Sequence, residues 1–251
     1  MPISSLARTS PSNLISSFRP VILIAAAAVA CSATSAMAQV GSVFVDARSN
    51  IFGYGISTPQ PGGGGGGLIA VTIDLTPGTG RVVTFNNTGS AGWSSASPLN
   101  GPDGGASFNG FTRTVIPAVG PISGYSAPRV GPLVGLVLDA SDPTGLPAPS
   151  SISYTDIASL NATSFSPGLR QVFFIGDGFT GTGSGATQQF LIPDSATRLV
   201  LGIADAGNFN IRAGFYTDNR QGYNVDYSVV PSPSAAALLG LGGLLAARRR
   251  R

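Results

Sequence analysis

Glycine is the residue that most constrains the fold of this chain, since 35 of its 251 residues are glycine. Glycine weakens the interior of a helix but permits the tight turns that join β-strands. Between the glycines, alternating or β-branched apolar residues recur in short runs, and no run outside the two ends has a helical period. We therefore expect an all-β sandwich or barrel with strands at residues 43–47, 68–75, 81–86, 133–139, 151–155, 172–175, 188–192, 197–203 and 223–230.

The residue types that the chain lacks exclude most catalytic chemistry. It contains no His, Lys or Glu, and its one cysteine is Cys31. Without these residues there is no Ser-His-Asp triad, no Schiff-base lysine and no zinc site built on His or Cys. A pair of aspartates could still act as a glycosidase, because that mechanism needs only two carboxyl groups at a set separation. The 11 aspartates are scattered among expected turns, which favours solvated turn residues and a protein that is not an enzyme.

The N-terminal segment has the pattern of a secretory signal peptide. Two arginines lead into an apolar run at residues 21–33, and small residues at and before Ala38 suit a signal peptidase. We therefore expect a signal peptide at residues 1–38 and cleavage before Gln39. A competing interpretation places a lipid on Cys31, although the usual leucine three residues upstream is missing.

The C-terminal segment combines a short motif, an apolar stretch and a basic cluster. Pro231, Ser232 and Pro233 precede thirteen mostly apolar residues, 235–247, and the chain closes with four arginines. At about 1.5 Å per residue the apolar stretch is only roughly 20 Å long as a helix, against a hydrocarbon core of about 30 Å. The arginines favour a cytoplasmic C-terminus, which would leave the preceding domain outside.

This three-part tail resembles the PEP-CTERM sorting signal of bacteria that make extracellular polysaccharide, with Pro-Ser-Pro in place of the usual Pro-Glu-Pro. The resemblance implies processing by an exosortase-type membrane enzyme that cuts near the motif and leaves the domain at the cell surface or in the extracellular matrix. An ordinary C-terminal anchor helix is the alternative. Residues 39–230 would then form one domain, followed by a sorting and anchoring segment at residues 231–251.

The charge of the expected domain differs from that of the whole chain. Residues 39–230 hold eight arginines against eleven aspartates, a net charge of 8 − 11 = −3. Nucleic-acid binding needs a basic surface for phosphate contacts, so a nucleic-acid partner is not expected. A polyanionic partner is disfavoured for the same reason.

Two loops, at residues 91–105 and 205–222, combine oxygen ligands with tight turns. Adjacent Asp218 and Asn219 in a glycine-bearing loop suit a hard cation such as calcium. The same pair also commonly forms turns without any ligand. Trp93, the only tryptophan, could stack on a sugar ring, but its strand-like surroundings favour a place in the core.

Several short motifs in these loops occur in the same order in a known family. Residues 199–205 end in an aspartate and lead, after an insertion at 206–212, into Ala-Gly-Phe-Tyr-Thr-Asp-Asn at 213–219. Ala-Gly-Trp at 91–93 and Gly-Pro-Asp-Gly at 101–104 precede them. Together these residues resemble the PA-IL-like family of calcium-dependent galactophilic lectins, small β-sandwich proteins that bridge a sugar through bound calcium. The resemblance implies a jelly-roll-like, galactose-binding-like sandwich.

The resemblance also assigns ligands to a calcium ion. Asp205, Asp218 and Asn219 would supply side-chain oxygens, and Phe215 and Ala96 would supply backbone carbonyls. An added carboxylate at position 218, where the family has an asparagine, strengthens a site for a hard cation.

The expected ligand of such a site is a glycan of the extracellular polysaccharide. Vicinal hydroxyls would enter the calcium shell, and Asp205, Asp218, Tyr216 and Arg212 would contact the sugar. Tyr216 and Tyr223 are expected to line the binding surface. The family's sugar-contacting histidine has no counterpart here, which favours an alternative: a structural or adhesive surface protein of the same fold without a sugar site.

Overall fold

The computed structural model describes residues 38–54 and 66–231 of the chain, except for the side chain of Pro231. Ser232, Pro233 and almost all of the expected signal peptide and tail lie outside the described residues. Within the described ranges no helix has the length and hydropathy needed to cross a membrane. The helices described there are all short: α1 (Ile157–Leu160), η1 (Ile51–Gly53), η2 (Gly207–Phe209) and η3 (Tyr216–Asp218).

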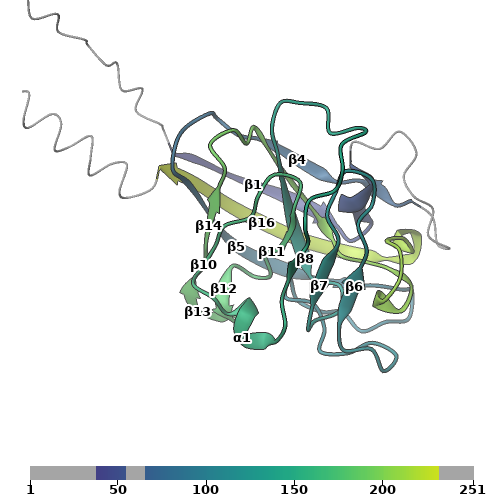
Figure 1. Ribbon diagram of the computed structural model, residues 1–251. Helices are drawn as coiled ribbons and strands as arrows, with labels where there is room; N and C mark the ends of the chain where they lie inside the picture. Colours follow the sequence, from purple (N-terminus) through teal and green to yellow (C-terminus); the bar gives the residue numbers. More distant parts are fainter. Residues whose placement is uncertain (1–37, 55–65, 232–251) are drawn as a thin grey trace, which may run out of the picture. The chain divides into compact units, whose positions relative to one another are not determined.

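The first main sheet has five strands and is built around two long ones. Figure 1 shows three of its strands, β1, β16 and β5, running side by side, and each pair is antiparallel. Its strands, in spatial order, are β1 (Gln39–Asp46), β16 (Arg220–Pro231), β5 (Arg81–Gly92), β14 (Gln189–Ile192) and β10 (Ser164–Phe165). Along β16, Tyr223, Val225 and Val229 are buried while Asn224 and Asp226 are exposed, which is the alternation expected of a sheet with one solvated face.

The second main sheet has six strands, and its central strands are buried on both faces. It consists of β11 (Val172–Phe174), β8 (Leu133–Leu138), β15 (Arg198–Ile203), β2 (Ser49–Asn50) and β3 (Leu68–Ile69), with β4 (Val71–Asp74) also paired to β15. Every residue of β8 is buried. Leu133 and Val137 pack in one apolar cluster, and Leu136 packs in a second one. Burial on both faces explains why the strand is a continuous apolar run.

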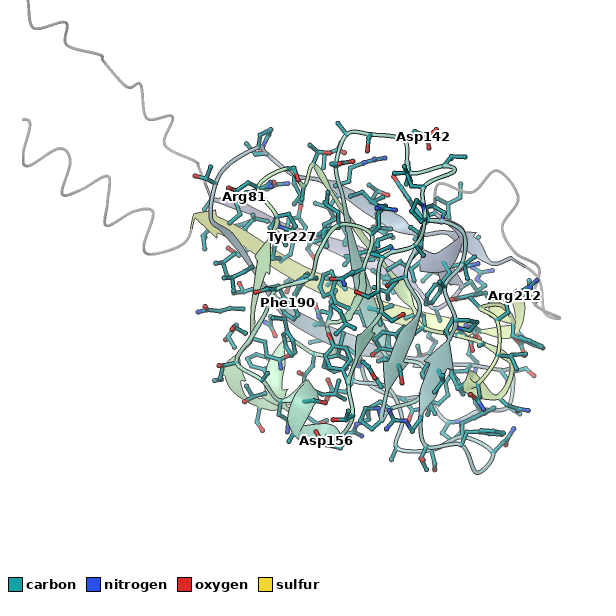
Figure 2. The ribbon with its side chains drawn as sticks, in the orientation of Figure 1. Arg81, Asp142, Asp156, Phe190, Arg212 and Tyr227 are labelled. Atoms are coloured by element: carbon teal, nitrogen blue, oxygen red, sulfur yellow. The ribbon has the colours of Figure 1, made fainter. Side chains whose placement is uncertain are left out.

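The first apolar cluster joins the two main sheets. It combines Val83 and Phe85 of β5 with Val137 of β8 and Leu199 of β15. Phe190 of β14 lies within this cluster (Figure 2). The ring centroids of Phe190 and Phe85 are 5.2 Å apart. The inner faces of the two sheets therefore share one core.

The second apolar cluster lies between the second sheet and a smaller one. The smaller sheet has three strands, β6 (Thr114–Ile116), β7 (Tyr125–Ala127) and β9 (Ile152–Ser153). Its Ile116 and Tyr125, with Leu160 of α1, pack with Leu136 and Val200 of the second sheet. A separate hairpin is formed by β12 (Phe179–Gly181) and β13 (Ser184–Thr187).

The prediction of an all-β fold is confirmed for the described residues. Each of the nine expected strands overlaps a strand of the structure, although residues 68–75 divide into β3 and β4. The sequence did not indicate β2, β6, β7, β10, β12 or β13.

Candidate functional site

The site forms where β15 ends and β16 begins. After Ile203 the chain passes through η2 and η3 before it re-enters the first sheet at Arg220. An isolated bridge between Ala206 and Ala213 closes the base of the intervening loop. The insertion at residues 206–212 therefore loops outward, and its two ends stay close together.

Asp205 is held at the base of this loop by the residues that follow it. Its side chain and backbone are 2 % exposed in total. The backbone N–H of Gly214 donates to the Asp205 carbonyl at 3.2 Å. The Tyr216 hydroxyl donates to the carbonyl of Ile203 at 2.8 Å and accepts a bond from the Asp205 N–H at 3.3 Å. These contacts fix the backbone of Asp205 at the end of β15.

The side chain of Asn219 is hydrogen-bonded to the Asp205 carboxylate. The Asn219 Nδ2 donates to Asp205 Oδ2 at 2.8 Å and to the carbonyl of Ala47 at 3.0 Å. Asn219 is 5 % exposed, and its Oδ1 is buried without a hydrogen-bond partner among the described residues. A buried amide oxygen without a partner is costly, so a donor or a cation placed beside it would be stabilising.

The electrostatic environment of Asp205 disfavours its charged form. Burial raises the pKa of Asp205 well above its ordinary value, and the nearby charge of Asp218 raises the pKa further. The bond from Asn219 acts in the opposite direction but is outweighed. No arginine is among the groups that shift the pKa of Asp205.

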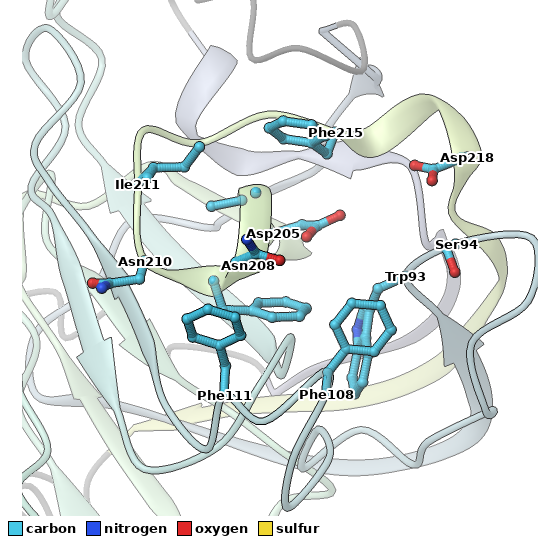
Figure 3. Close-up of a pocket in the computed structure, with 13 residues that line it drawn as sticks. Trp93, Ser94, Phe108, Phe111, Asp205, Asn208, Asn210, Ile211, Phe215 and Asp218 are labelled. Carbon is cyan, nitrogen blue, oxygen red and sulfur yellow. The ribbon is translucent and has the colours of Figure 1, made fainter.

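Asp205 and Asp218 line a common cavity of about 440 Å³. Figure 3 shows both carboxylates directed into the space on the Ser94 side of this cavity. Asp218 is exposed, whereas Asp205 is buried. The cavity thus brings together two acidic residues that are separated by the insertion in the sequence.

The opposite wall of the cavity is aromatic. The rings of Trp93, Phe108 and Phe209 meet edge to face, with centroids 5.2 to 5.8 Å apart. Phe111 and Phe215 also line the cavity (Figure 3). Such a wall offers an apolar surface to one face of a ligand while the carboxylates face its polar edge.

The aromatic wall depends on a tight turn that the sequence analysis missed. Phe108 and Phe111 pair as an isolated bridge around Asn109 and Gly110, which both have positive φ, 48° and 81°. Asn-Gly is the most favoured pair for such a turn, so Phe-Asn-Gly-Phe was a usable signal.

Strained backbone accompanies the acidic side of the cavity. Asn208, Phe209 and Phe215 all have positive φ, of 51°, 56° and 72°. Residues other than glycine seldom adopt this conformation, and such strain is concentrated at functional sites. Here the Phe215 conformation starts the η3 turn that presents Asp218 to the cavity.

Two tyrosines do not line the surface that the sequence suggested. Tyr216 and Tyr223 are both fully buried in the first apolar cluster. The Tyr216 hydroxyl donates to the carbonyl of Ile203, and the Tyr223 hydroxyl donates to the carbonyls of Asn100 and Gly101. The prediction that Tyr216 contacts a sugar is therefore wrong, because its ring stabilises the loop from inside.

Three of the predicted site residues, Ala96, Arg212 and Asn219, are not among the residues that line the cavity. Ala96 is exposed in a turn stabilised by Ser94 and Ser97, and Ser94 is the residue of that turn that reaches the cavity. Arg212 is exposed on the outer part of the insertion (Figure 2). Trp93 is buried as expected and donates from Nε1 to the Gly131 carbonyl at 3.1 Å, yet it also forms part of the cavity wall.

The residues present fit a hard cation in their donor chemistry. Asp205 and Asp218 offer carboxylate oxygens, and Asn219 offers a buried Oδ1 that has no hydrogen-bond partner in the described part of the chain. Calcium binds carboxylate, amide and backbone carbonyl oxygens. In the described ranges no three acidic, His or Cys residues cluster as a ready metal site, so a cation here would also need backbone, water or ligand oxygens.

Comparisons with family models, curated proteins and solved structures give no match for this chain.

Proposed function

We propose that this protein is an exported, non-enzymatic carbohydrate-binding protein that holds a glycan through calcium at Asp205 and Asp218. Its fold would be a jelly-roll-like β-sandwich, and its tail a PEP-CTERM-type sorting segment read by an exosortase-type enzyme. The location would be the cell surface or the extracellular matrix, with transient membrane anchoring through residues 231–251.

One observation carries this proposal: the buried carboxylate of Asp205 and the exposed carboxylate of Asp218 line one cavity together with an aromatic wall. A sugar has both matching surfaces, since its hydroxyl edge ligates a cation and its C–H face packs on aromatic rings. Asp205, Asp218 and Asn219 Oδ1 would hold calcium, which when bound would accept vicinal hydroxyls as ligands. Phe111 and Trp93 would orient the ring.

The test is a broad glycan panel probed with the full chain, with calcium and then with chelator. The proposal predicts saturable binding that the chelator abolishes. Asp218→Ala should abolish it as well, while Asp226→Ala should not, because Asp226 is exposed on the outer face of β16. Binding that is insensitive both to chelator and to Asp218→Ala contradicts the assignment.

A second candidate is a structural or adhesive surface protein of the same fold. It is favoured by the edge strand β1, which exposes Val40 and Phe44 by 74 % and 55 %. Exposed apolar edge strands promote association with other chains. This candidate predicts no saturable glycan binding and concentration-dependent self-association, measured by sedimentation velocity, which Phe44→Lys reduces.

A further inference from the structure

A second cavity of about 450 Å³ has the opposite electrostatic character to the first. Six residues line it: Ala106, Thr112, Arg113, Pro128, Arg129 and Ile157. None of them is acidic, and two carry a guanidinium group. The cleft shares no lining residue with the Asp205 cavity, although Phe108 and Phe111 of that cavity belong to the same loop as Ala106 and Thr112.

The strand register brings the two arginines together. Thr114 of β6 pairs with Ala127 of β7, so Arg113 and Arg129 lie just beyond the ends of these paired strands. The Thr114 hydroxyl donates to the Arg129 carbonyl at 2.8 Å and fixes the backbone there. The two side chains therefore start from a rigid strand end, a good base for a binding site.

Arg113 is held in place without being neutralised. Its guanidinium donates to the carbonyls of Thr155 and Tyr154, both at 3.0 Å, and to the Ser126 hydroxyl at 3.4 Å. All three acceptors are uncharged, so the positive charge remains available to an anion. The carboxylate of Asp156, which follows Thr155 in the chain, accepts a hydrogen bond from the Ser159 N–H at 2.8 Å and so caps the start of α1.

Arg129 is the more available of the pair. It is half-buried against the cleft, and among the described residues its guanidinium makes no hydrogen bond or ion pair. A planar guanidinium binds carboxylate or sulfate oxygens through paired N–H donors. Pro128 and the exposed Ile157 give the cleft an apolar side.

We propose that this cleft binds a single sugar ring that carries one carboxylate or sulfate group. The anionic group would lie against Arg129 and Arg113, and the apolar face of the ring against Pro128 and Ile157. The choice of a sugar rests on the proposed function, whereas the preference for an anion rests on the two arginines. The net charge of −3 over residues 39–230 disfavours a polyanion but not one charged ring.

The test is calorimetric titration of the full chain, in chelator, with three probes: a methyl glucuronide, a methyl galactoside 6-sulfate and the neutral methyl glucoside. We expect one or both charged glycosides to bind and the neutral one not to bind. Arg129→Gln should weaken binding about tenfold, as expected for a lost hydrogen bond to a charged group. Arg48→Gln, which removes an equal charge from a residue that does not line the cleft, should leave the affinity unchanged.

The outcomes separate this inference from the calcium site. Binding in chelator supports the cleft even if no calcium is bound at Asp205, and the charged glycoside that binds identifies the anionic group. If Arg129→Gln fails to fold, Arg129→Lys keeps the charge and should still weaken binding, because the planar donor pair is lost. Absence of binding by both charged glycosides, or equal affinities in the Arg129 and Arg48 variants, overturns the proposal.

Discussion

Asn219 donates one hydrogen bond to Asp205 Oδ2 and another to the carbonyl of Ala47, and so ties the end of β15 to the end of β1. The side chains of Asn219 and Asp205 belong to residues that are both almost fully buried. The same side chain leaves its Oδ1 without a partner among the described residues. Asn219 therefore connects the stability of the fold with the chemistry of the candidate site.

Removing this connection should destabilise the protein. Asn219→Ala leaves the Asp205 carboxylate and the Ala47 carbonyl without a donor, and a bond to a charged group contributes about 1.5–3 kcal/mol. We expect a loss of about 2–3 kcal/mol in the free energy of unfolding, measured by urea denaturation in chelator. Asn224→Ala on the exposed face of β16 serves as the control and should change it by less than about 0.5 kcal/mol.

The pH dependence of stability should reveal Asp205. Burial raises its pKa in the folded state above the ordinary value of 3.8, so the unfolded chain loses this proton first as pH rises. The stability linked to the protonated form is complete below about pH 3.8 and is lost as pH rises through the folded pKa. Asp205→Asn does not titrate, so in chelator its stability relative to wild type should increase with pH.

The measurement is urea denaturation of both proteins at pH values from about 3 to 8. Groups that titrate in both proteins, such as Asp177, cancel in the comparison. A difference that stays constant over this range would show that Asp205 does not titrate abnormally.

The back of the aromatic wall should be intolerant of added volume. Gly131 has φ 58°, and a Cβ there would overlap the indole ring of Trp93. Gly131→Ala should therefore cost about 2–4 kcal/mol of stability, since both the backbone and a packed ring must move. Gly101→Ala is the matched control, because a Cβ at that position meets nothing within 4 Å. Thermal melting of the two variants should separate them clearly.

The aromatic wall should also contribute to ligand affinity. Phe111 is only partly buried and lines the cavity, so Phe111→Ala removes contact area without emptying the core. We expect sugar affinity to fall about five- to tenfold, the equivalent of about 1–1.4 kcal/mol. Trp93 is the only tryptophan, so its fluorescence reports binding directly. Unchanged affinity would show that the ring is not packed on this wall.

The sequence predicted the strands whose side chains alternate or form apolar runs, such as β8, β15 and β16. It did not indicate β12 and β13, whose Gly-, Ser- and Thr-rich residues lack an apolar pattern. Strands of two or three residues, such as β7 and β10, are too short to show a period.

The candidate site was only partly predictable because its residues come together through tertiary contacts. Asp218 was identified from a local loop pattern and Asp205 from the family resemblance, and both line the cavity. Phe108 and Phe111 lie about a hundred residues before Asp205 in the chain, and nothing local places them opposite it. Tyr216 was misplaced because its neighbours Thr217 and Asp218 are exposed, whereas the η3 turn directs its own ring into the core.

Calorimetric titration of calcium into the chelator-treated full chain tests whether Asp205 and Asp218 hold a calcium ion. We expect a single site with micromolar to millimolar affinity and a rise in melting temperature on binding. Asp218→Ala should abolish the heat, while Asp226→Ala should retain it. No heat and no thermal shift in the wild-type protein, or an unchanged titration in Asp218→Ala, would contradict a calcium site at Asp205 and favour the structural surface protein.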